Sequence, residues 1–141
     1  MLVGTYYHSL ESKGRFSLPK AFRGEAERWV LTSGLDGCLF IFREQDFASE
    51  VEKLSRLSYL RSDNRAVVRL IAGNADVQQV DNLGRLTIPP HLQKQAGLAK
   101  QLVIVGSLNR IEVWDSQRYN QMMDELEHNA AARAEAVTLE S

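Results

Sequence analysis

The chain has 141 residues, of which 44% are hydrophobic and 25% charged, the proportions of one globular domain or two very small ones. This composition excludes collagen, low-complexity disorder and a disulfide scaffold, since the single cysteine, Cys38, cannot form an intramolecular disulfide. With 17 Lys and Arg against 18 Asp and Glu, the formal net charge is −1 and indicates neither a nucleic-acid nor a membrane partner. Any such partner must therefore bind a local cationic patch.

The first residues lack the charged-then-apolar order of a secretory signal, and no apolar run approaches the roughly 20 residues of a membrane-spanning helix. The sequence therefore predicts a cytoplasmic protein without a membrane partner.

The sequence repeats itself at an offset of 70 residues. The repeat aligns Leu10 with Val80, Glu11 with Asp81, Gly14 with Gly84, Arg15 with Arg85, Leu18 with Ile88 and Pro19 with Pro89. At an offset of 72 the match continues, from Gly34 on Gly106 to Phe42 on Trp114. A repeat of this kind predicts two similar structural units.

The first copy, residues 5–47, reads as a strand, a turn that needs the positive φ of Gly14, and a short strand with inward Phe16 and Leu18. Pro19 then suits the first turn of a short helix over residues 20–27. A β-hairpin over 29–32 and 38–42 closes the copy. The second copy, residues 77–120, predicts the same order, with strands at 77–80 and 86–88, a helix at 91–96 and a hairpin at 102–105 and 110–114.

A longer helix is expected after each copy. Apolar residues from Phe47 to Leu57 recur at helical spacing, and residues 48–73 are predicted to be connecting helices. Residues 116–135 are predicted to form a C-terminal helix whose apolar face runs from Tyr119 to Ala130. Most residues on these two faces are expected to pack in the core, and some to contact neighbouring subunits.

A copy of about 40 residues is too small to hold a core by itself, so we expect the two copies to share one. Pairing about a pseudo-twofold axis would bury Phe16, Leu18, Leu86 and Ile88 together. The whole chain, residues 1–141, is therefore predicted to be a single pseudo-symmetric domain.

The motifs E-S-K-G-R-F-S-L-P and D-N-L-G-R-L-T-I-P resemble those of the bacterial MraZ family and, more broadly, of the AbrB-like swapped-hairpin superfamily. The opening G-T-Y-Y-H-S-L-x-S-K-G-R and the later G-x-x-N-R-I-E-V-W also resemble MraZ sequences, so the resemblance covers nearly the whole chain. It implies an α+β fold in which two tandem AbrB-like swapped-hairpin motifs form a pseudo-twofold β-barrel-like core with flanking helices.

The same resemblance implies a sequence-specific, nucleoid-associated transcriptional regulator. Such proteins bind tandem repeats in double-stranded DNA upstream of the division and cell wall gene cluster, including their own promoter. They act as ring-shaped homo-oligomers, which here would be octamer-like or larger.

Two arginines stand out because each follows a turn glycine, where a guanidinium can fork onto phosphate or guanine. The predicted DNA-binding residues are Arg15, Lys13, Arg85, Lys20 and Arg23, and the predicted motif-orienting residues are Glu11, Gly14, Asp81 and Gly84. The alternative is that Arg15 and Arg85 only form exposed ion pairs with Glu11 and Asp81. Glu11 departs from the family's aspartate, and its extra methylene keeps the charge but moves the carboxylate relative to the turn.

Local charge supports the DNA interpretation. Residues 8–23 carry four cationic side chains against one carboxylate, whereas residues 115–141 carry two against six. A cationic hairpin surface with an acidic tail pointing away is compatible with a pI near 6.3.

No enzyme, metal or cofactor signature was found: the three histidines lie in different elements, and Cys38 falls in an apolar strand pattern. We therefore expect a protein that is not an enzyme and has no cofactor. Two alternatives stay open. One is an AbrB-like antitoxin or protein-interaction module with secondary DNA binding, and the other is a purely architectural oligomer.

Overall fold

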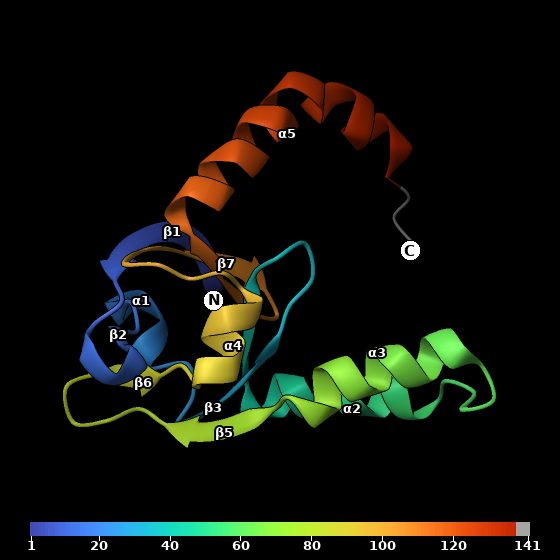
Figure 1. Ribbon diagram of the computed structural model, residues 1–141, viewed down its shortest axis with the longest axis horizontal. Coiled ribbons are helices and arrows are strands. Elements are labelled where there is room, and N and C mark those ends of the chain that lie inside the picture. The colour runs from blue at the N-terminus through green and yellow to red at the C-terminus, as the bar shows by residue number, and fades with distance from the viewer. Residues whose placement is uncertain (138–141) are drawn as a thin grey trace.

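The computed structural model describes residues 1–137, which form a six-stranded sheet, a two-stranded sheet and five α-helices (Figure 1). The elements are β1 (Leu2–Ser9), β2 (Arg15–Ser17), α1 (Lys20–Arg23), β3 (Arg28–Ser33), β4 (Leu39–Arg43), α2 (Glu44–Ser55), α3 (Ser62–Gly73), β5 (Asp76–Gln79), β6 (Arg85–Thr87), α4 (Pro90–Gln95), β7 (Gln101–Leu108), β8 (Ile111–Asp115) and α5 (Ser116–Ala136). A 3-10 turn, Ser12–Gly14, links β1 to β2.

The strand order of the large sheet, β1-β7-β8-β4-β3-β5, is symmetric under exchange of the two sequence copies. The first strand of each copy pairs with a strand of the other copy, β1 with β7 and β5 with β3, in antiparallel register. The short strands β2 and β6 pair with each other in the second sheet. Neither copy therefore contains its own complete sheet.

Equivalent residues face each other where the two copies meet. Phe16 lies opposite its repeat equivalent Leu86 in the β2–β6 pair. Phe40 lies opposite Glu112, its equivalent at the offset of 72, in the β4–β8 pair. Strand pairing in both sheets is thus symmetric under exchange of the two copies.

Alternation along the strands divides the apolar residues between two clusters on opposite faces of the large sheet. The main cluster lies between this sheet and the layer of β2, β6, α1 and α4, and it contains Phe16, Leu18, Leu86 and Ile88, all buried as predicted. The second cluster lies on the other face and contains Phe40, Phe42 and Trp114.

The sheet does not close into a barrel, which corrects the expected barrel-like core. Its edges are β1 and β5, and no pairing joins them among the described residues. The two edges also differ in length, since β1 has eight residues and β5 four. The chain before β5 is helical rather than extended, so it cannot lengthen that strand.

The longer helices are far less buried than their periodicity suggested. Neither α2 nor α5 has a buried residue, and only Phe47, Tyr119 and Met122 pack in part against the second cluster. The prediction that most residues of these faces lie in the core was therefore wrong. The α2–α3 pair extends to the right in Figure 1, away from β2 and β6, and carries several exposed apolar side chains. These are Val51, Leu57, Tyr59, Leu60, Val67 and Leu70.

Among the described residues, no helix combines the length and apolar character needed to cross a bilayer.

Candidate nucleic-acid interface

The two glycine turns predicted from the motif lie at the same end of the molecule, at the left of Figure 1. Each turn is followed directly by one strand of the β2–β6 pair. In this pair Arg15 lies opposite Thr87, and Arg85 lies opposite Ser17. The two arginines thus stand at the two ends of one short antiparallel ribbon. The helical hairpin α2–α3 projects from the opposite side of the protein.

Asp81 organises the second turn. Its Oδ1 accepts hydrogen bonds from the backbone N–H groups of Leu83 (2.9 Å) and Arg85 (2.8 Å), and its Oδ2 accepts one from Arg85 Nε (2.9 Å). Gly84 takes the positive φ of 79° that this turn requires. The backbone hydrogen bond from Arg85 is the main reason why the pKa of the Asp81 carboxyl is lowered.

The first turn is built differently, because Glu11 does not hold its own arginine. The Glu11 carboxylate reaches across to the second copy, to Arg85 Nη1 (3.5 Å), and accepts a hydrogen bond from Ser17 Oγ (3.4 Å). Arg85 is therefore held by two carboxylates, and its pKa is raised chiefly by its hydrogen bond to Asp81. Arg15, which is half-buried, has no ion pair or side-chain hydrogen bond within residues 1–137.

The ion pair expected within each turn is thus present for Arg85 with Asp81 but absent for Arg15 with Glu11 among residues 1–137. The extra methylene of glutamate accounts for the difference, since it moves the carboxylate away from its own turn. Sequence reasoning identified the departure of Glu11 but missed the cross-copy pair, which has no local signal.

Arg23 does not point freely into solvent. Its Nε donates to the carbonyl oxygen of Leu18 (2.7 Å), and a Cβ built on Gly84 would lie 2.5 Å from its Cζ. Gln93, at the equivalent position of the second copy, donates to the Ile88 carbonyl (2.7 Å) and lies in the same way against Gly14. At Gly14 a Cβ would also lie 2.8 Å from the backbone oxygen of Ile88, so this glycine is needed for close approach as well as for turn geometry. Arg23 supports the turn, a role that sequence reasoning missed although the repeat aligns it with Gln93.

Lys13 and Lys20 are exposed, and neither forms an ion pair among the described residues. Lys13 sits within the first turn at a φ of 63°, a left-handed conformation that is uncommon for a residue with a side chain. The structure therefore brings Lys13 and Arg15 together as unneutralised cations beside the first turn, whereas Arg85 is neutralised. Unneutralised cations at one end of a protein can bind phosphate groups.

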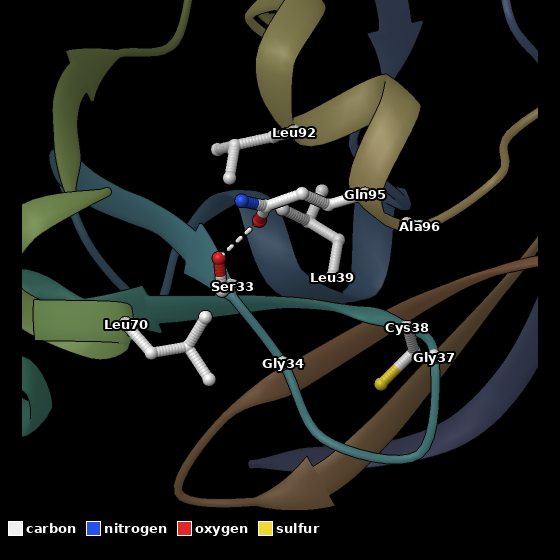
Figure 2. A pocket seen from close by; sticks show the side chains of 9 residues that line it. All are labelled: Ser33, Gly34, Gly37, Cys38, Leu39, Leu70, Leu92, Gln95 and Ala96. Atoms are coloured by element: carbon white, nitrogen blue, oxygen red, sulfur yellow. Dashed lines mark hydrogen bonds between the residues drawn. The ribbon is translucent and has the colours of Figure 1, made fainter. Parts of the chain in front are cut away.

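A cavity of about 340 Å³ lies away from the turns, between the β3–β4 hairpin and α4 (Figure 2). Leu92, Cys38, Ser33 and Gln95 are among the residues that line it, and the Ser33 hydroxyl donates a hydrogen bond to the Gln95 side chain. The Cys38 thiol is buried as predicted, and this burial together with the charges of Glu112 and Asp36 raises its pKa to about 12. At neutral pH Cys38 is therefore a protonated core residue rather than a nucleophile. Within the described part of the chain, no three potential metal ligands come together.

The sequence profile of the MraZ family, described as "MraZ protein, putative antitoxin-like", matches the chain twice, at residues 1–70 and 71–140. The chain belongs to the MraZ family. The two matches divide it between the copies that the internal repeat defines.

Curated relatives in the MraZ family carry the name transcriptional regulator MraZ. The protein of Alkaliphilus metalliredigens is 40% identical over 126 residues, covering 89% of this chain and 88% of the relative. That of Pediococcus pentosaceus is 40% identical over 130 residues, covering 92% and 91%. That of Acetivibrio thermocellus is 36% identical over 140 residues, covering 99% and 98%.

Proposed function

We propose that this chain is a sequence-specific DNA-binding transcriptional regulator in the cytoplasm, associated with the nucleoid, and not an enzyme. The observation that carries this proposal is the pair of unneutralised cations, Lys13 and Arg15, beside the first glycine turn. Arg15 can fork onto phosphate or onto the O6 and N7 of guanine, and Lys13 can contact phosphate. The name shared by the curated relatives points the same way.

The DNA-facing surface in this proposal is the end of the molecule that holds both turns, with the β2–β6 ribbon between them. Arg15, Lys13, Lys20 and Arg85 make the contacts, and Arg23 contributes its charge while supporting the turn. Glu11, Asp81 and the glycines Gly14 and Gly84 set the shape of the turns. The cross-copy strand pairing supports our proposal that the fold is an AbrB-like swapped hairpin in one pseudo-symmetric domain.

Lys13, Arg15 and Lys20 by themselves neutralise few phosphates, so one protomer would bind DNA weakly. We propose that the chain forms a ring-shaped homo-oligomer, octamer-like or larger, in which several turns bind tandem DNA repeats together and raise the avidity. The exposed apolar side chains of α2 and α3, on the side opposite the turns, support self-association through these helices. The DNA sites would lie upstream of the division and cell wall gene cluster, including the protein's own promoter.

Fluorescence anisotropy tests this function with a labelled duplex taken from upstream of the gene and a scrambled duplex of equal composition. We expect tight binding to the first, weak binding to the second, and an affinity that falls steeply as salt rises. Equal affinity for both duplexes would reject sequence-specific regulation, and no binding to either would favour the protein-interaction alternative. In light scattering we expect a mass several times that of the 15.9 kDa chain, and a monomer at micromolar concentration would reject the ring.

A further inference from the structure

The tip of the second turn carries an apolar side chain where the first turn carries a cation. At the offset of 70 residues, Leu83 is the equivalent of Lys13. The Leu83 side chain is 68% exposed, so it does not contribute to the core. At the end of the molecule that we assign to DNA, this leucine is available to pack against an apolar group of the ligand.

The second turn holds Leu83 in a fixed position. Its backbone N–H donates to Asp81 Oδ1, the same oxygen that accepts from the Arg85 N–H. On the inner side, Gly84 is buried against the Arg23 guanidinium, and its carbonyl accepts from Leu18 N–H (2.9 Å). A turn fixed in this way loses little backbone entropy when its tip binds a ligand.

The charge around Leu83 is nearly balanced. Arg85 is paired with both Asp81 and Glu11, and the Arg23 guanidinium lies on the inner side of Gly84, where it donates to the Leu18 carbonyl. The tip of this turn, Asn82 and Leu83, therefore has no cation of its own to offer a phosphate. Asn82, beside Leu83, is uncharged and exposed. By contrast, the first turn has unneutralised Lys13 and Arg15. The second turn is thus poorly suited to phosphate and well suited to an apolar group.

The C5-methyl of thymine is the apolar group that double-stranded DNA presents in the major groove. We propose that Leu83 packs against a thymine C5-methyl, so that the second turn reads an A·T pair while the first turn makes the cationic contacts. This inference rests on the proposed DNA-binding function and adds a specificity-determining residue to it.

The test replaces the thymines of the bound duplex one at a time by deoxyuridine, which lacks only the C5-methyl. For the parent protein we expect a loss of about fourfold in affinity at one thymine of each bound repeat, the equivalent of one buried methyl group. Leu83→Ala should bind the thymine and deoxyuridine duplexes equally. Its circular dichroism spectrum and melting temperature should match those of the parent, because Leu83 is exposed.

Leu83→Lys, which installs the residue of the first turn, is the matched control. It should bind DNA with a steeper salt dependence than the parent and without discrimination between thymine and uracil. A parent that binds the repeats but tolerates uracil at every position would overturn the Leu83 contact and leave the DNA-binding function standing. The contact would also be overturned if Leu83→Ala still bound the thymine duplex more tightly than the deoxyuridine duplex. A change in the oligomer mass of Leu83→Ala would overturn it as well, because it would assign Leu83 to a contact between copies. A parent that binds no repeat at all would overturn the DNA-binding function and this inference with it.

Discussion

The two glycine turns occupy equivalent places in the repeat, yet they are stabilised differently. Asp81 folds back on its own turn and holds Arg85, whereas Glu11 crosses to Arg85 and leaves Arg15 without an ion-pair partner in the part of the chain that the structure describes. The core below them differs much less, because Phe16 and Leu86 face each other and are both buried. The comparison shows that the two copies remain equivalent in the main core and differ at the turns.

The largest difference between the turns is expected in DNA binding. Arg15→Ala should abolish detectable binding to the upstream repeats, because each lost arginine contact costs about 1–3 kcal/mol and the loss recurs in every bound protomer. Arg85→Ala should weaken binding much less, since its guanidinium is already held by two carboxylates. Anisotropy titrations of both variants measure this difference, with thermal melting as the control for folding. Equal losses in the two variants would contradict the comparison.

The core residues should behave alike in the two copies. Leu86→Ala and Phe16→Ala should each lower the free energy of unfolding by about 2–5 kcal/mol, because each leaves a cavity at the centre of the shared core. Urea denaturation followed by circular dichroism measures both values. A large loss for one variant and almost none for the other would show that the copies do not share this core equally.

Exchanging the acidic residue of the first turn should make the turns more similar. In Glu11→Asp the shorter carboxylate is expected to cap its own turn and hold Arg15, as Asp81 holds Arg85. Binding to the repeats should then weaken by up to about fivefold, since an exposed ion pair is worth at most about 1 kcal/mol. Anisotropy measures this change, and unchanged binding in Glu11→Asp would show that the unpaired state of Arg15 does not contribute.

The smallest expected effect concerns His8, whose repeat equivalent is Gln78. The pKa of His8 is lowered from 6.5, mainly by burial and then by the charge of Arg23. Below pH 6.5 the unfolded chain therefore binds more protons at this residue than the folded protein, so stability should fall as the pH drops through this range. His8→Gln should reduce this decline, measured by urea denaturation between about pH 7.5 and about pH 5.5. An identical pH dependence in the variant and the parent would assign the decline to other groups.

Much of this arrangement could be predicted from the sequence because the repeat gives positions as well as elements. It located Gly14 and Gly84 at positive φ and Phe16 and Leu86 in one core. The repeat did not show that β1 and β5 each pair with a strand of the other copy, because pairing between strands far apart in the chain leaves no periodic signal. Helical spacing showed which residues of α2 share a face, but not that the face stays uncovered. Whether Arg15 has an ion-pair partner depended on a single methylene in Glu11.

The exchanged edge strands also bear on how the protein is made. β1 leaves the ribosome long before its partner β7, because the pairing sets Leu2 opposite Leu108. The apolar residues of the first copy must therefore wait for most of the polypeptide before their sheet is complete, and contacts of such long sequence separation form slowly. A nascent chain in this state exposes strand edges and apolar surface. We expect its newly made first half to depend on chaperones until β7 has emerged.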